Sequence, residues 1–315
     1  MSHFPVMLPE VLQAINPQDG DVIVDGTFGA GGYSEAFLER SDCTVVAIDQ
    51  DPNAITRAKE LKDKYGERFI FARGQFGDAV ALLNEAGFES VDGFVLDIGV
   101  SSMQIDQAER GFSFQRNGPL DMRMDTQSND VTAQKIVNQT EEEDLANIIY
   151  KYGEERLSRR IAKKICEVRK EKEIKTTNEL SDIVQSVVPK NPKKKTHPAT
   201  KTFQALRIMV NDELGQLEAG LEASQALLKN GGRLVVVTFH SLEDGIVKRF
   251  LDEKSGRQVN QSRHLPSQAP VKRSKIFEVK KRKSIEASEE ELKNNARSRS
   301  AKMRVAYRTD EKEVA

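Results

Sequence analysis

Four short apolar runs, each rich in β-branched residues, alternate with amphipathic stretches over the first hundred residues. The runs are residues 21–25, 44–49, 68–74 and 92–99, and helical spacing fills residues 33–40, 52–65 and 77–86 between them. Near-continuous apolar strands separated by helices are typical of a parallel sheet covered on both faces. We therefore predict an α/β fold with a doubly wound, mostly parallel sheet.

Three of these predicted strands have an aspartate at or near their carboxyl end. These residues are Asp25, Asp49 and Asp97. In doubly wound sheets, ligands bind outside the carboxyl ends of the strands. An acidic residue at three such ends therefore predicts a ligand site along this edge of the sheet.

The next strand of the same kind, residues 232–239, follows only after more than a hundred further residues. Ordinary connections in α/β units are much shorter. The intervening segment is helical in pattern, so we expect an all-helical subdomain at residues 106–207, inserted into a discontinuous α/β domain of residues 1–105 and 208–315. A helix at 242–251 and two late strands, at 276–280 and 303–308, complete the expected order.

The turn after the first strand reads "DGTFGAGGYS" and contains four glycines within seven residues. From Gly29 onwards it nearly matches the dinucleotide fingerprint G-x-G-x-x-G/A, with Ser34 in the last place. A pyrophosphate binds backbone N–H groups at a helix N-terminus and is repelled by a neighbouring carboxylate such as Asp25. The same glycines could also serve only to form a tight turn.

S-adenosylmethionine has different requirements, because it carries an ammonium and a sulfonium group and no phosphate. Asp25 then attracts the ligand, so the loop residues Gly29, Gly31 and Gly32 favour this cofactor. Asp49 is placed to accept hydrogen bonds from two ribose hydroxyls, a contact that NAD would also make. An NAD-dependent oxidoreductase therefore stays open as the alternative at this point.

The fourth strand ends in "LDIGVSSMQ", which places Asp97, Ser101 and Ser102 where an exocyclic amine would meet the methyl donor. Hydrogen-bond acceptors that hold the amine protons favour direct attack, with no metal or covalent intermediate. His240, at the end of the fifth strand, is a further candidate helper, and an equally plausible structural residue. A hydrolase triad of His240, Ser241 and Asp244 is disfavoured, because no G-x-S-x-G elbow surrounds the serine.

The two cysteines, Cys43 and Cys166, form no CxxC pair and lie far apart. We expect both to be buried, with no disulfide and no metal site. Methylation of carbon 5 of a pyrimidine normally requires a cysteine nucleophile, and neither cysteine is well placed for that role. No His, Asp and Glu spacing suggests zinc.

Charge is unevenly distributed along a chain with 48 Lys and Arg, 49 Asp and Glu and a net charge of −1. Residues 245–308 carry 18 Lys and Arg against 7 Asp and Glu, which indicates either polyanion binding or a solvated basic surface. The N-terminus does not resemble a signal peptide, and no apolar run approaches membrane-spanning length. We expect a cytoplasmic protein with no membrane partner.

Several uncommon strings occur together between residues 25 and 250. They are "DGTFGAGGYS", "AIDQDP", "LDIGVSS", "ERGFSF", "GPLDMRMD", "YGEER", "HPATKTFQALRI", "VNDEL" and "TFHSLEDGIVKRF". In identity and order they make the chain resemble the bacterial 16S rRNA cytosine-N4 methyltransferases of the MraW/RsmH type.

The resemblance implies a class I S-adenosylmethionine-dependent methyltransferase fold with an inserted substrate-recognition subdomain. It implies methylation of the N4 amine of a cytidine in the decoding region of 16S rRNA, on the small ribosomal subunit or a late assembly intermediate, with a homodimer as one expected state. A noncatalytic RNA-binding assembly factor that keeps an unused pocket is the third hypothesis; the intact acidic strand ends disfavour it.

The resemblance also assigns individual residues. Gly31, Gly32 and Tyr33 would bind the cofactor through the glycine loop, Asp49 its ribose and Phe76 its adenine, with Asp97 and Gln104 completing the pocket. Histidine is common in the family where Tyr33 stands here. The residues expected to contact RNA are Lys193, Lys194, Lys195, His197, Thr200 and Thr202.

Overall fold

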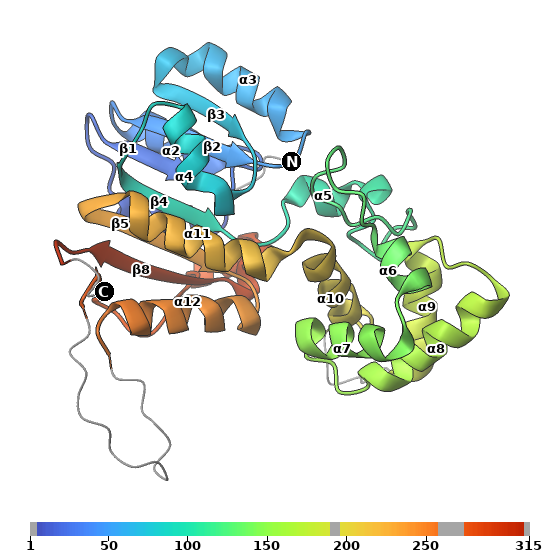
Figure 1. Ribbon diagram of the computed structural model, residues 1–315. Coiled ribbons are helices and arrows are strands. Elements are labelled where there is room, and N and C mark those ends of the chain that lie inside the picture. The colour runs from blue at the N-terminus through green and yellow to red at the C-terminus, as the bar shows by residue number, and fades with distance from the viewer. Residues whose placement is uncertain (1–4, 190–195, 258–273, 312–315) are drawn as a thin grey trace, which may run out of the picture. The chain divides into compact units, whose positions relative to one another are not determined.

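The computed structural model describes residues 5–189, 196–257 and 274–311 (Figure 1). The chain forms two compact units. The first combines Met1–Gly99 with Leu214–Ala315, and the second is Val100–Glu213. The predicted insertion, residues 106–207, lies within the second unit, which includes a few more residues before and after it in the sequence.

The first unit is built on one eight-stranded sheet in the order β3-β2-β1-β4-β5-β8-β6, with β7 paired to β8. Its strands are β1 Val22–Asp25, β2 Thr44–Asp49, β3 Phe69–Arg73, β4 Val91–Asp97, β5 Leu228–Thr238, β6 Phe277–Glu278, β7 Ile285–Glu286 and β8 Lys302–Arg308. β1 to β5 are parallel, and β8 is antiparallel to β5. This mostly parallel sheet confirms the predicted class I methyltransferase fold.

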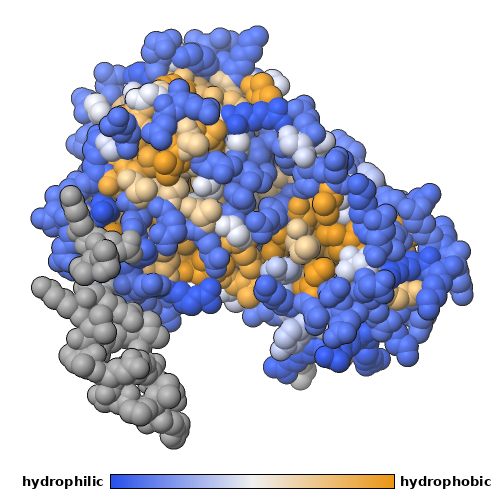
Figure 2. All heavy atoms as spheres, viewed as in Figure 1, coloured by the Kyte–Doolittle hydropathy of each residue, from blue (hydrophilic) through white to orange (hydrophobic). Residues whose placement is uncertain are grey.

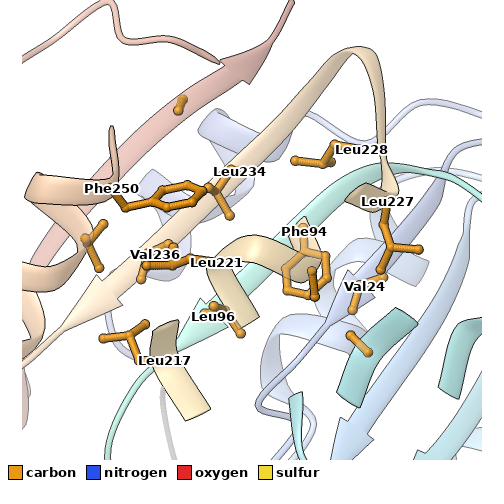
Figure 3. Close-up of a cluster of buried hydrophobic side chains, with 14 of the residues drawn as sticks. Val24, Phe94, Leu96, Leu217, Leu221, Leu227, Leu228, Leu234, Val236 and Phe250 are labelled. Atoms are coloured by element: carbon orange, nitrogen blue, oxygen red, sulfur yellow. The ribbon is translucent and has the colours of Figure 1, made fainter. Parts of the chain in front are cut away.

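Helices cover both faces of this sheet, because its strands carry apolar side chains on both faces. Val24, Phe94 and Leu96 pack on one face against helices α11 and α12 (Figure 3), and Ile23, Val45 and Val95 belong to the cluster that includes α1, α2 and α3. The helices are α1 Leu8–Ile15, α2 Gly32–Arg40, α3 Ala54–Tyr65, α4 Ala79–Glu85, α11 Glu213–Leu227, α12 Ser241–Lys254 and α13 Glu289–Asn294, with the 3-10 turns η1 Gly66–Arg68, η2 Phe76–Asp78 and η4 Ala296–Ser300.

The second unit is helical. Its elements are α5 Ser102–Asp106, η3 Ala108–Arg110, α6 Ala133–Gln139, α7 Glu142–Gly153, α8 Ser158–Glu171, α9 Thr177–Val187 and α10 Thr200–Asn211. Apolar residues at helical spacing, such as Leu145 and Ile149 of α7 and Ile161 and Ile165 of α8, form its own core. Figure 2 shows mostly hydrophilic residues on the outer surface of these helices.

None of the helices in the described ranges combines the length and the apolar character that crossing a membrane requires.

Candidate active site

The glycine loop connects β1 to α2 and has a backbone that side chains would obstruct. Gly29 and Gly31 have φ values of +52° and +77°, which disfavour residues with a Cβ. A Cβ on Gly31 would lie 2.7 Å from the Phe28 ring, and one on Gly32 would lie 2.1 Å from Cγ of Pro5. Internal packing therefore accounts for Gly31 and Gly32, and the positive φ accounts for Gly29, without any ligand.

Asp25 supports this loop from the inside. Its side chain is 1% exposed; Oδ2 accepts a hydrogen bond from the Ser34 hydroxyl at 2.7 Å, and Oδ1 accepts one from the Thr27 N–H at 3.3 Å. Burial raises the pKa of Asp25 to about 6. The structure thus favours an effect of Asp25 on a ligand through its charge rather than through direct contact.

Asp49 ties the end of β2 to the same loop. Its Oδ2 accepts a hydrogen bond from the Gly29 N–H at 2.7 Å, and its Oδ1 accepts one from the Asp51 N–H at 2.8 Å. Burial, followed by smaller repulsion from Asp51 and Asp25, raises the pKa of Asp49 to about 6, against the lowering effect of these hydrogen bonds. The carboxylate still has acceptor capacity for two hydroxyl donors, because each oxygen carries two lone pairs.

Asp97 ends β4 and carries an unsatisfied acceptor. Its backbone N–H donates to Thr27 Oγ1 at 2.7 Å, whereas its Oδ1 is buried and has no hydrogen-bond partner among the described residues. Burial and then the charges of Asp25, Glu243 and Glu291 raise the pKa of Asp97 well above its usual range. An unpartnered buried acceptor is costly, so this position fits a ligand that brings a donor or a positive charge.

The two aromatic residues of the predicted site have different roles. Tyr33 is 4% exposed, its ring stacks on Phe37 and its hydroxyl donates to the Val6 carbonyl, which leaves its backbone as the part available to a ligand. Phe76 is the first residue of η2. A Cβ built on Gly26 would lie 3.3 Å from Cβ of Phe76, and a Cβ built on Gly220 of α11 would lie 2.6 Å from the Phe76 ring. Phe76 is therefore fixed beside the loop.

His240 caps α12 rather than pointing to an open site. Its Nδ1 accepts a hydrogen bond from the Glu243 N–H at 3.4 Å, and its Nε2 lies 2.8 Å from Glu243 Oε1. Glu243 is fully buried, and its Oε2 accepts the N–H groups of Phe239 and His240. With both ring nitrogens beside Glu243, the geometry supports a structural role for His240. The hydrolase triad is not formed, because Asp244 pairs with Arg304 at 2.7 Å.

The sequence profile of the MraW methylase family matches residues 1–309. The chain belongs to this family. It is 54% identical over 307 residues to the ribosomal RNA small subunit methyltransferase H of Paramagnetospirillum magneticum, covering 98% of this chain and 96% of the relative. The proteins of the same name from Parvibaculum lavamentivorans and Rickettsia massiliae are 53% and 52% identical, over 98% and 97% of this chain and 89% and 97% of theirs.

This MraW-family protein is an S-adenosylmethionine-dependent methyltransferase, which removes the oxidoreductase alternative. Its first unit gathers the predicted cofactor residues at one edge of the sheet, since β1 lies between β2 and β4 with Asp25 in register with Ala47 and Val95. The gathered residues are Asp25, Gly29, Gly31, Gly32, Tyr33, Asp49, Phe76 and Asp97.

Apart from His240, the other predicted residues belong to the second unit, and several of them have local roles there. Ser101 and Gln104 form the capping box of α5, with hydrogen bonds of 3.2 and 2.9 Å. Thr200 begins α10, and Thr202 is fully buried in that helix, which excludes direct contact with RNA in this conformation. The Ser102 side chain and Lys193, Lys194 and Lys195 lie outside what the structure describes. His197, on the turn before α10, stacks on Phe114 with ring centroids 4.5 Å apart.

The charges of two further acids, Glu243 and Glu291, act on Asp97, and of these Glu291 was not predicted from the sequence. Glu291 accepts a hydrogen bond from the Met7 N–H at 2.7 Å, although 284 residues separate the two. The local signal for Glu291 was a capping pattern, in which Ser288 is the N-cap of α13 and Glu291 follows three residues later. Neither the described cysteines, both unpaired and buried, nor any described cluster of His, Cys, Asp and Glu forms a metal-binding group.

Proposed function

We propose that this protein methylates the N4 amine of a cytidine in the decoding region of 16S rRNA, on the small ribosomal subunit or a late assembly intermediate. The relatives named ribosomal RNA small subunit methyltransferase H support the RNA substrate, because they match nearly the full length of both chains at more than 50% identity. The observation that carries the reaction type is the buried, unpartnered Oδ1 of Asp97 beside the glycine loop.

In the proposed site, the backbone at Gly31, Gly32 and Tyr33 faces the methionine portion of the cofactor, and Asp49 accepts from its ribose hydroxyls. Phe76 lies by the adenine, and Gln104 is the remaining residue that we propose for cofactor binding. Asp25 favours the cationic cofactor through its charge. When bound, S-adenosylmethionine supplies the methyl group, which leaves the sulfonium sulfur for the amine nitrogen.

Asp97 has the properties that the amine requires. The N4 lone pair of cytosine is delocalised into the ring, so an acceptor that holds an amine proton favours the pyramidal geometry needed for attack. Oδ1 of Asp97 is free to accept that proton in a hydrogen bond, and its raised pKa makes the carboxylate a better proton acceptor than an ordinary aspartate. Ser101 and Ser102 remain candidate helpers in this proposal.

The state of the cysteines supports N4 rather than carbon 5 as the acceptor atom. Cys43 and Cys166 are both buried, and burial raises the pKa of each thiol. Attack on carbon 6 of a pyrimidine, which methylation of carbon 5 requires, needs a reactive thiolate. Direct transfer to the amine needs no covalent enzyme intermediate.

The test is methylation of unmodified small subunits and of naked 16S rRNA with labelled S-adenosylmethionine, followed by nucleoside analysis and mass mapping. We expect N4-methylcytidine at one decoding-region position, and loss of that modification in cells lacking the gene. Label in 5-methylcytidine would contradict the proposed reaction, and unmodified cytidine on every substrate would favour the assembly-factor hypothesis. Sedimentation of the same preparation tests the expected homodimer.

A further inference from the structure

One end of the helical unit, where α7 ends and α8 and α10 begin, is rich in cations and carries an exposed aromatic side chain. We propose that this cationic end, made of Tyr150, Arg156, Arg159, Arg160 and Lys163 with Lys201, binds a single-stranded segment of the RNA substrate. The proposal rests on the proposed function for the RNA class and adds the surface that holds it.

The "YGEER" stretch, residues 152–156, fixes the geometry of this end. A Cβ on Gly153 would lie 2.4 Å from the Lys201 carbonyl oxygen, so the first turn of α10 packs directly on the end of α7. Lys201 Nζ donates to the Glu154 carbonyl at 2.6 Å, and Glu154 itself has a left-handed φ of +50°. The C-terminal end of α7 and the first turn of α10 are thereby held together.

The same stretch then turns the chain into α8. Glu155 is buried, and its Oε1 accepts the Leu157 N–H at 2.9 Å, while its carbonyl accepts the Ser158 N–H at 3.2 Å. Arg156 is the next side chain and is exposed. Within this turn the glycine and the second glutamate are used for packing and hydrogen bonds, and Arg156 is presented to solvent.

Exposed cations lie around the start of α8. Arg156, Arg159, Arg160 and Lys163 make no ion pair with any described residue. Two later lysines differ, because Lys164 pairs with Glu167 within α8, and Lys172, at the C-cap of α8, pairs with Glu179 of α9.

The position of these cations is also unfavourable for the helix itself. Arg159 and Arg160 lie in the first turn of α8, where the positive end of the helix dipole favours acids, and that turn has none. By contrast, α7 begins with Glu142, Glu143 and Asp144. Two cations in the first turn of α8 therefore reduce stability with no compensating ion pair among the described residues, which favours an anionic partner.

Aromatic groups at this end match single-stranded nucleic acid rather than a generic anion. Tyr150, in the last turn of α7, is 63% exposed and is the most exposed large hydrophobic residue among those described. His197 lies three residues before α10, and its ring stacks on Phe114. The Phe114 ring in turn contacts Phe203 edge-on, with ring centroids 5.0 Å apart. Unstacked bases bind on exposed aromatic faces while nearby cations hold the phosphates.

The first experiment compares two triple variants of equal charge change. One combines Arg156→Gln, Arg159→Gln and Arg160→Gln; the control combines Lys164→Gln, Lys172→Gln and Lys175→Gln, which neutralises lysines that are paired with glutamates. Affinity for a decoding-region 16S rRNA fragment and for small subunits is measured over a range of salt concentrations.

We expect the arginine triple variant to bind RNA at least about tenfold more weakly and to lose about two units of salt slope, since each single-strand phosphate contact contributes about 0.7. Its KM for RNA should rise, while kcat at saturating RNA and cofactor affinity stay unchanged. The control should keep the wild-type slope. Equal losses in both triple variants, or an unchanged slope in the arginine variant, would overturn the proposal.

The second experiment addresses stacking. Tyr150→Ala should weaken RNA binding roughly 5- to 100-fold, as expected for loss of one stacked base, and Tyr150→Phe should bind like the wild type. Wild-type affinity in Tyr150→Ala would exclude the stacking contact. If methylation is normal and these variants bind normally, only this proposal fails; if no RNA is methylated by the wild type, the proposed function fails independently of them.

Discussion

The acidic edge of the α/β unit and the cationic end of the helical unit show opposite ways of placing charge. Asp25 is buried and Asp49 and Asp97 are partly buried, and loss of hydration raises the pKa of each. Arg156 and Arg159 are exposed to water and have no acidic partner in the part of the chain that the structure describes. Buried charge is unfavourable until a small ligand complements it, whereas exposed charge acts over a distance on a large partner. In our two proposals, the first region therefore binds one small cation and the second binds a polyanion.

The largest expected effect separates these two tasks. Asp97→Asn keeps the size of the side chain but cannot take up a proton as a carboxylate does, so turnover should fall roughly 10²- to 10⁴-fold. RNA affinity should stay at the wild-type value. Steady-state kinetics and RNA binding are measured in parallel, with Asp92→Asn as the control, because Asp92 lies on the same strand and accepts from Lys229 instead. Collapse of RNA affinity with normal turnover at saturating RNA would make Asp97 a substrate ligand.

The next effect concerns the cofactor alone. Asp49→Ala removes the acceptor proposed for the ribose hydroxyls and should weaken S-adenosylmethionine binding by about 1–3 kcal/mol. Calorimetry measures the affinity, and thermal unfolding of the cofactor-free variant reports the separate loss of the Gly29 hydrogen bond. Wild-type affinity would contradict the ribose role.

A smaller effect follows from pH. Asp25 and Asp49 have pKa values of about 6 in the cofactor-free protein, and a cationic cofactor favours their ionised forms. Binding then releases protons, so affinity should rise with pH up to about 6 and level off above about 7. Below pH 6 it should fall by up to about tenfold per pH unit for each carboxyl. Calorimetry from pH 5 to 8 checks this, and tighter binding at pH 5 than at pH 7 would contradict it.

The smallest expected effect concerns the contribution of the cationic end to the stability of the helical unit. Arg159→Gln and Lys163→Gln should each change the free energy of unfolding by less than about 0.5 kcal/mol, because neither side chain makes an ion pair among the described residues. Denaturant unfolding measures this. A loss above about 1 kcal/mol in either variant would mean that the cationic end contributes to folding.

The sequence predicted the sheet well because its strands are apolar on both faces and end at recognisable positions. It placed Asp25 and Asp49 at strand ends, but it could not show that Ser34 turns toward Asp25 or that the Gly29 N–H bonds to Asp49, since these depend on the loop's φ values. The serine that breaks the dinucleotide fingerprint is the partner of the first carboxylate.

Other features of the structure could not be predicted from the sequence, because they depend on side-chain orientation or on contacts between distant residues. The burial of Thr202 was not apparent, because a motif does not reveal which face of its helix packs inward. The cap formed by His240 requires the orientation of its ring toward Glu243. Glu291 lies in a basic part of the sequence, and its contact with Met7 joins the two ends of the chain. Such long-range pairings leave no local pattern.

That last contact has a consequence for synthesis of the protein. Pro5 packs on Gly32, the Val6 carbonyl accepts the Tyr33 hydroxyl, and the Met7 N–H is held by Glu291. The cover of the glycine loop is thus secured by residues that emerge from the ribosome almost last. A chain released before α13 would lack this anchor, so the Met7 contact forms only after α13 has been synthesised.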